Sequence, residues 1–215
     1  MIHLLCAYAK RRGYLPKDWD ELDRLEKVKV KNGGNVAIFT PDEMAKLLSA
    51  ATPEFLPALA IGAYAGLRTA EVERLDWREV HFAERFIEVT AGKAKTASRR
   101  IVPISDNLAA WLAPHVKPTG NVWGGGKITI CNVQGDTSKA AGVPWKKNAL
   151  RHSFCSYRLA ENKNAAQVAL EAGNSPQMIF QHYRQLVTEA EATRWFAIRP
   201  KAPANVVPLA SSAHP

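Results

Sequence analysis

Three short strings in the chain carry side chains that could act together on a phosphate ester. They are residues 66–71 (GLRTAE), 149–154 (ALRHSF) and 173–184 (GNSPQMIFQHYR). Attack on a phosphodiester puts extra negative charge on the non-bridging oxygens of a crowded phosphorus. The first two strings each contain an arginine, Arg68 and Arg151, whose planar fork of donors stays charged at any relevant pH and suits that charge.

In this order and with these separations, the strings resemble the tyrosine recombinases of the phage integrase type over roughly residues 39–196. The resemblance implies that Arg68 and Arg151 bind the scissile phosphate. It also implies that Tyr183 attacks phosphorus, giving a 3′-phosphotyrosyl link and a free 5′-hydroxyl, so the bond energy is kept and no ATP, metal or other cofactor is required. Without this context, Tyr183 would be interpreted as packing one turn from Ile179 on an amphipathic helix.

Two further positions follow from the resemblance. Lys95, on a hairpin tip eight residues before Pro103, is expected to be the general acid that protonates the leaving 5′-oxygen. Lys93 competes for that role, and either lysine could instead contact a phosphate or be solvated. Glu71, one helical turn from Arg68, is expected to support the site, with an ordinary surface ion pair as the alternative.

The chain departs from the family at two positions. Most members have histidine three residues before the second arginine, where this chain has Asn148, and histidine or tryptophan after the glycine, where it has Asn174. Neither asparagine can exchange a proton, although both can donate a hydrogen bond to phosphate. Proton abstraction from Tyr183 therefore loses its usual candidate.

Two histidines could compensate, His152 and His182. We expect both to be structural, because His152 follows Arg151 on a helix whose opposite face it should occupy. The family commonly has histidine there without a catalytic role. Basic residues that are expected to contact DNA are Lys93, Arg99, Arg100, Lys146, Lys147 and Arg184.

The hydrophobic pattern predicts a mainly α fold with a small antiparallel sheet, as in the tyrosine recombinase catalytic domain. A helix begins at the capping sequence Thr40-Pro41-Asp42-Glu43, and Thr69 is placed to cap another that carries Val72 and Leu75. Further helices are predicted at 55–65, 108–113, 148–160, 164–172 and 175–183. Strands are predicted near 80–82, 86–89 and 100–104, with a hairpin tip at 91–98. Residues 118–126 are predicted to be irregular.

The chain divides into three parts in this interpretation. Residues 1–34 are expected to be a remnant helix of an N-terminal core-binding domain with a charged linker, 35–199 the catalytic domain, and 200–215 a disordered tail. The stretch from 120 to 142 matches no pattern that we can interpret.

Composition is compatible with a DNA-binding protein. The 215 residues have a formal net charge of +9 with 20 acidic residues among the charges, which favours a folded basic surface. Such a surface suits nucleic acid or an anionic membrane, or only confers solubility, and charge alone does not choose between them. The three cysteines, Cys6, Cys131 and Cys155, fit neither a disulfide framework nor a zinc site. The apolar N-terminal stretch is too short to span a bilayer, so we expect a cytoplasmic protein with no membrane partner.

Three functions are compatible with these observations. The main hypothesis is site-specific DNA recombination or integration by several protomers, as a homo-oligomer on double-stranded DNA. A truncated integrase relic that only binds DNA is the runner-up, because Asn148 and Asn174 replace the usual histidines. A type IB topoisomerase shares the arginine and tyrosine chemistry, but the compact spacing favours a recombinase.

Overall fold

A computed structural model describes residues 2–19, 36–90, 99–125, 129–183 and 186–201. The chain forms two compact units, Met1–Asn35 and Val36–Pro215. The first contains helix α1 (Ile2–Arg11), whose last turn carries two basic residues, Lys10 and Arg11. Positive side chains there interact favourably with the negative end of the helix dipole. The hairpin tip predicted at 91–98, with Lys93 and Lys95, lies outside the described residues, as do Arg184 and most of the predicted tail.

The second unit begins with α2 (Pro41–Ala50), and its predicted capping box is confirmed. The Thr40 backbone N–H donates to Oε2 of Glu43 at 2.8 Å, and the Glu43 N–H donates to Thr40 Oγ1 at 3.2 Å. The next helix, α3 (Leu56–Tyr64), has every residue from Pro57 to Tyr64 buried. It packs against α5 (Asp106–Leu112) and α7 (Ala149–Asn162), so it forms the centre of the apolar core.

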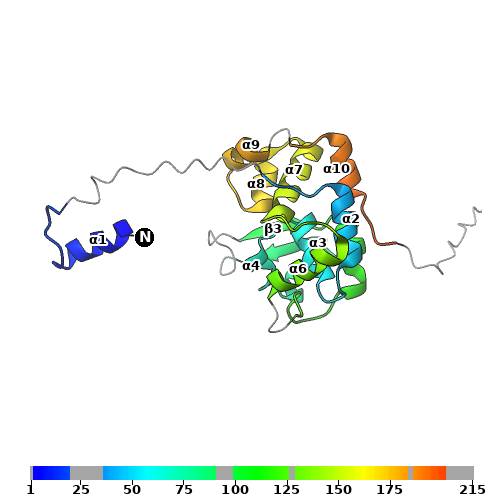
Figure 1. Ribbon diagram of the computed structural model, residues 1–215, viewed down its shortest axis with the longest axis horizontal. Coiled ribbons are helices and arrows are strands. Elements are labelled where there is room, and N and C mark those ends of the chain that lie inside the picture. The colour runs from blue at the N-terminus through cyan, green and yellow to red at the C-terminus, as the bar shows by residue number, and fades with distance from the viewer. Residues whose placement is uncertain (1, 20–35, 91–98, 126–128, 184–185, 202–215) are drawn as a thin grey trace, which may run out of the picture. The chain divides into compact units, whose positions relative to one another are not determined.

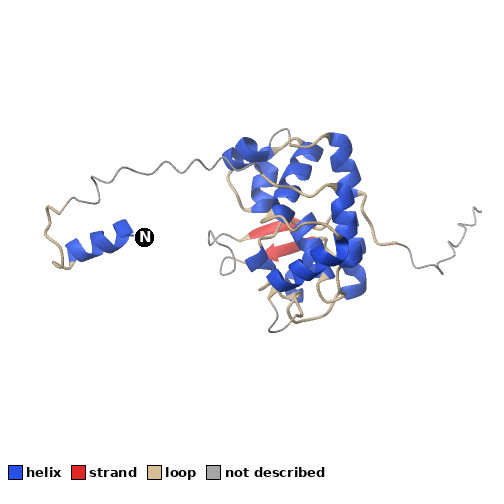
Figure 2. Ribbon diagram, in the orientation of Figure 1, coloured by secondary structure: helices blue, strands red, loops and turns tan. Residues whose placement is uncertain are grey.

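A three-stranded antiparallel sheet lies among the helices (Figure 2). Its strands are β1 (Val80–His81), β2 (Phe86–Val89) and β3 (Arg100–Pro103), with Ile87 opposite Val102. Side chains alternate between the two faces of a strand, and Arg100 is therefore on the same buried face as Val102. The sheet thus points one arginine inward.

The C-terminal helices surround α7 (Figure 1). Helix α8 (Ala165–Ala172) contacts β3, α7 and α9 (Pro176–Tyr183). Helix α10 (Glu189–Phe196) packs on α7, where Trp195 stacks on Tyr157 with ring centroids 4.4 Å apart. A second, smaller apolar cluster joins α7, α8 and α9, so the end of α9 is anchored by packing.

The predicted fold class is confirmed, with three local differences. Thr69 was expected to cap α4 (Thr69–Val72), but Arg68 occupies the N-cap position instead. Helix α6 (Ile130–Ala141) lies in the stretch that matched no pattern, and α10 was also missed. Short 3₁₀ turns cover Trp77–Glu79 and Ala113–His115. In the described part of the chain, none of the helices combines the length and apolarity of a membrane span.

Gly66 shows how tightly the chain is packed before α4. Its φ is +64°, and a Cβ atom at this position would lie 2.2 Å from the Phe154 ring. Its carbonyl also accepts a hydrogen bond from Arg151 at 2.7 Å. Only glycine satisfies both the backbone conformation and the close approach.

Replacing Gly66 by alanine should therefore lower the free energy of unfolding, measured by urea denaturation. Gly66→Ala combines left-handed strain of about 1–2 kcal/mol with overpacking of about 1–3 kcal/mol. Gly142→Ala is the matched control, because its φ is +63° and nothing lies within 4 Å of an added Cβ. Equal losses in the two variants would show that the Phe154 contact has no energetic consequence.

Candidate active site

Arg68 reaches the end of α8 from the start of α4. Its Nη1 donates to Oε1 of Glu71 at 2.9 Å, and its Nη2 donates to the Gly173 carbonyl at 2.8 Å and to Asn174 Oδ1 at 3.4 Å. The side chain keeps 23% of its surface exposed. The guanidinium is therefore held in one orientation while still reachable by a ligand.

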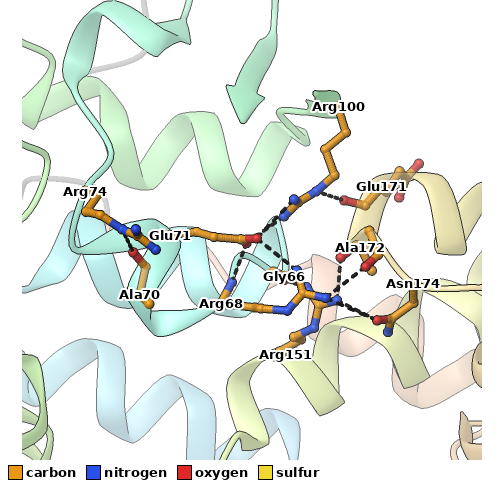
Figure 3. Close-up of polar contacts among 11 residues, drawn as sticks. Gly66, Arg68, Ala70, Glu71, Arg74, Arg100, Arg151, Glu171, Ala172 and Asn174 are labelled. Carbon is orange, nitrogen blue, oxygen red and sulfur yellow. Dashed lines mark hydrogen bonds and ion pairs between the residues drawn. The ribbon is translucent and has the colours of Figure 1, made fainter. Parts of the chain in front are cut away.

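Arg151 approaches the same point from the first turn of α7 (Figure 3). Its Nη1 donates to the Gly66 carbonyl, and its Nη2 donates to the Ala172 carbonyl and, at 3.1 Å, to Asn174 Oδ1. Both guanidiniums thus bind the same amide oxygen. Burial lowers the pKa of Arg151, and the Arg68 cation adds to this, but an arginine remains protonated near neutrality.

The carboxylate of Glu71 lies between Arg68 and a third arginine, Arg100. Nη1 and Nη2 of Arg100 bind the two carboxylate oxygens at 3.1 and 2.7 Å. Glu71 is only 2% exposed, so it is no ordinary surface pair. Burial alone would raise its pKa, but hydrogen bonds from Arg100 and from the Arg68 backbone outweigh burial and leave the pKa below its usual value.

The C-terminal end of α8 binds one arginine at each of three successive carbonyls. The Glu171 carbonyl accepts from Arg100 Nε at 3.0 Å, and the next two carbonyls accept from Arg151 and Arg68. Carbonyls in the last turn of a helix lack helical partners and carry the negative end of the helix dipole. This helix end therefore gathers cations that would otherwise repel one another.

Tyr183 lies at the end of α9 beside the first turn of α7. Its hydroxyl is 2.8 Å from Nδ1 of His152, and its ring packs in the apolar cluster with Ile179. The residue is 7% exposed, and burial raises the pKa of the phenol to about 12. Packing and a polar contact therefore coexist at this residue.

The expectation that His152 occupies the face of α7 opposite Arg151 is wrong. Successive helical residues are about 100° apart, which allows both side chains to face one hollow. A cavity of about 830 Å³ is lined by Arg68, Arg151, His152, Asn174 and Tyr183. The structure thus brings together the two arginines and the tyrosine that the sequence singled out.

The remaining predicted residues divide into three groups. Asn148, with a left-handed φ of 57°, and Lys147 are exposed and line the same cavity. Arg99 is exposed and pairs with Glu88 at 2.7 Å. Lys93, Lys95 and Arg184 lie outside the described residues.

Two more predicted DNA contacts, like Arg99, have carboxylate partners in the structure. Arg100 is buried, with Glu71 and the Glu171 carbonyl on its donors, so its charge is used inside the protein. The Lys146 ammonium binds both carboxylate oxygens of Glu43, at 2.8 and 2.7 Å, and the Ile38 carbonyl at 2.9 Å. In both cases a carboxylate already binds the cation, so a contact with DNA would have to compete with an ion pair inside the protein.

Glu171 is a supporting residue that the sequence analysis missed. Its carboxylate is buried and accepts from Nε and Nη2 of Arg158, each at 3.0 Å, while its carbonyl binds Arg100. It holds α8 against α7 close to the arginines. The signal was a single glutamate in the otherwise small and apolar second half of α8, where a carboxylate must find a cation.

Comparison with known families matches residues 37–189 to the phage integrase family. Solved structures with the same fold include the XerA recombinase, at 19% identity and a TM-score of 0.61, covering 91% of this chain and 80% of that one. The Tn1549 transposon integrase in complex with a circular intermediate DNA is 19% identical, with a TM-score of 0.56 and coverages of 86% and 73%.

A lambda integrase fragment, solved as a dimer bound to a core site, is 13% identical with a TM-score of 0.54, and the match covers 94% of this chain and 72% of that one. At these identities the structural likeness establishes the fold. No curated protein is similar enough in sequence to count as a match.

The buried Glu71 ion pairs should appear in the pH dependence of stability. The pKa of folded Glu71 lies below its unfolded value, so the stabilisation is full above the unfolded pKa and is lost as pH falls through the folded one. At neutral pH, Glu71→Gln should lower the free energy of unfolding by about 3–5 kcal/mol, since it leaves Arg100 without its buried partner.

The difference in free energy of unfolding between wild type and Glu71→Gln should become smaller as the pH is lowered below about 4.3. Glu84→Gln is the control, because this glutamate is exposed on the turn between β1 and β2. A difference for Glu71→Gln that stays constant from neutral to acidic pH would contradict the charged pair. Denaturant titrations at several pH values measure both variants.

Proposed function

Because the chain belongs to the phage integrase family of tyrosine site-specific recombinases, we propose that its Tyr183 cleaves and rejoins a DNA phosphodiester held by Arg68 and Arg151. The observation that carries this assignment is the shared Asn174 oxygen, to which both guanidiniums donate. Two cations that meet at one amide oxygen, in a cavity that also contains the tyrosine, have the arrangement that a single phosphate needs.

Cleavage proceeds by direct displacement at phosphorus. The Tyr183 oxygen gives up its proton to a base and forms a bond to phosphorus as the bond from phosphorus to the 5′-oxygen breaks. The leaving oxygen takes a proton from an acid, for which Lys95 is our candidate. Arg68 and Arg151 stabilise the charge on the non-bridging oxygens. Attack by a 5′-hydroxyl reverses the steps, and the phosphotyrosyl bond conserves the energy for rejoining.

Double-stranded DNA is the proposed partner, and several protomers are proposed to act together on it. The Tn1549 and lambda integrases, which share the fold, were solved with DNA, and the latter as a dimer. The net charge of +9 supports a polyanionic partner. We also propose that residues 1–34 belong to a core-binding domain that contacts the DNA, and that the protein acts in the cytoplasm.

Loss of the Tyr183 hydroxyl should abolish covalent attachment to DNA. The substrate is a pool of nicked duplexes enriched for binding to this chain from a randomised library, in which the nick traps the cleaved strand. Wild type should give a protein–DNA adduct on a denaturing gel, and Tyr183→Phe should give none while still binding DNA. Tyr64→Phe, which removes a phenol hydroxyl buried in the core outside the cavity, is the control that should react like wild type.

An adduct with Tyr183→Phe would assign the nucleophile to another residue. No adduct from wild type, on duplexes that it binds, would favour the DNA-binding relic. Relaxation of supercoiled DNA at random positions would favour the topoisomerase.

Binding should also weaken steeply with salt, because phosphate contacts release counterions. The logarithm of the association constant should fall linearly with the logarithm of salt concentration, by about 0.9 for each phosphate contact. Lys147→Gln should reduce this slope by about one unit. Lys146→Gln is the matched control and should leave it unchanged, since Glu43 already neutralises that ammonium. Fluorescence anisotropy at several salt concentrations measures the slopes, and salt-independent binding would contradict the proposed DNA partner.

A further inference from the structure

His152 is in direct contact with the hydroxyl that would attack phosphorus. Its Nδ1 lies 2.8 Å from the Tyr183 oxygen, and the two rings are tilted by 37°. The contact joins the first turn of α7 to the last turn of α9. The first turn of α7 therefore carries both Arg151, which is proposed to bind the phosphate, and His152, which contacts the tyrosine.

Three other polar side chains in the described part of the site are unsuited to accept the phenol proton. An asparagine amide neither gains nor loses a proton near neutrality, which excludes Asn148 and Asn174. The Asn174 oxygen is in any case occupied by two guanidiniums. The thiol of Cys155 also lies beside Tyr183, but burial raises its pKa to about 11, so it holds its own proton.

We propose that His152 is the general base of strand cleavage, taking the Tyr183 proton onto Nδ1 as the phenol oxygen bonds to phosphorus. This rests on the proposed function of Tyr183. The imidazole must be neutral, with its hydrogen on Nε2, so that the Nδ1 lone pair faces the hydroxyl. In rejoining, the imidazolium returns the proton to the tyrosine oxygen as the 5′-hydroxyl attacks, so atoms and charges balance in both directions.

The surroundings keep His152 in the form that a base requires. Burial lowers its pKa, and the Arg151 cation and His182 act in the same direction. Among the described residues, Arg151 on α7 and His182 and Tyr183 on α9 act on it or contact it, and Arg68 and Lys147 line the same cavity. These surroundings favour the neutral imidazole more than solvent does.

The test measures single-turnover adduct formation on the nicked duplexes across pH. Wild type should react faster as pH rises through the His152 pKa, below 6.5, and then level off. His152→Asn should lower the plateau about 10²–10⁴-fold and abolish the acid limb, with DNA binding unchanged. Asparagine is informative because its Oδ1 can replace Nδ1 as the acceptor of the hydroxyl hydrogen bond but cannot take the proton.

Two controls separate a base from other roles. His182→Gln should keep the rise in rate with pH at the acidic end of the profile, which assigns that rise to the titration of His152. A duplex whose scissile 5′-oxygen is replaced by sulfur no longer needs an acid for its leaving group, so it should not rescue His152→Asn if the histidine acts as a base. Rescue by the sulfur substrate would make His152 an acid and overturn the proposal.

The outcomes also distinguish this inference from the function on which it rests. If wild type forms an adduct and His152→Asn matches its rate at every pH, the histidine only positions the tyrosine and the inference fails, while the recombinase function stands. If wild type forms no adduct, or Tyr183→Phe still forms one, the assignment of Tyr183 fails and the inference fails with it.

Discussion

The candidate site depends on the interactions that hold three arginines close together despite their electrostatic repulsion. Three successive carbonyls at the C-terminal end of α8 each accept a hydrogen bond from one of them, Arg100, Arg151 or Arg68. The buried Glu71 carboxylate adds a full negative charge between Arg68 and Arg100. A helix end and one carboxylate together offset the mutual repulsion of the cations.

This arrangement explains why the buried Arg100 and the half-buried Arg68 and Arg151 have different roles. Arg100 comes from the inward face of β3 and has its charge neutralised by Glu71, so it positions Arg68 through a shared partner. Arg68 and Arg151 meet instead at the Asn174 oxygen, which carries no net charge. The hydrogen bonds of Arg151 go to uncharged oxygens, and Arg68 shares the single Glu71 carboxylate with Arg100. The site therefore keeps a net positive charge, and the cavity is suited to a phosphate.

The tyrosine is held by a different kind of contact. Apolar packing between α7, α8 and α9 fixes its ring, and the polar contact with His152 fixes the direction of its hydroxyl. Burial that secures the ring also raises the pKa of the phenol to about 12, so the proton must be removed as the bond to phosphorus forms. Burial thus fixes the position of the tyrosine but makes its hydroxyl harder to deprotonate, and we propose that the neighbouring His152 imidazole takes the proton.

The sequence by itself determined the residue types and the local elements. Arg68, Arg151 and Tyr183 were identified from their strings, and the Thr40 capping box and the strand alternation predicted α2 and the sheet, because capping and periodicity depend on neighbours in the chain. Only the tertiary structure decided that Arg100 and Lys146 turn to Glu71 and Glu43, and that His152 meets Tyr183. A lysine or arginine has the same sequence signature whether its partner is a phosphate or a distant carboxylate. The choice is made by which segments pack together, and that information is spread over the whole chain.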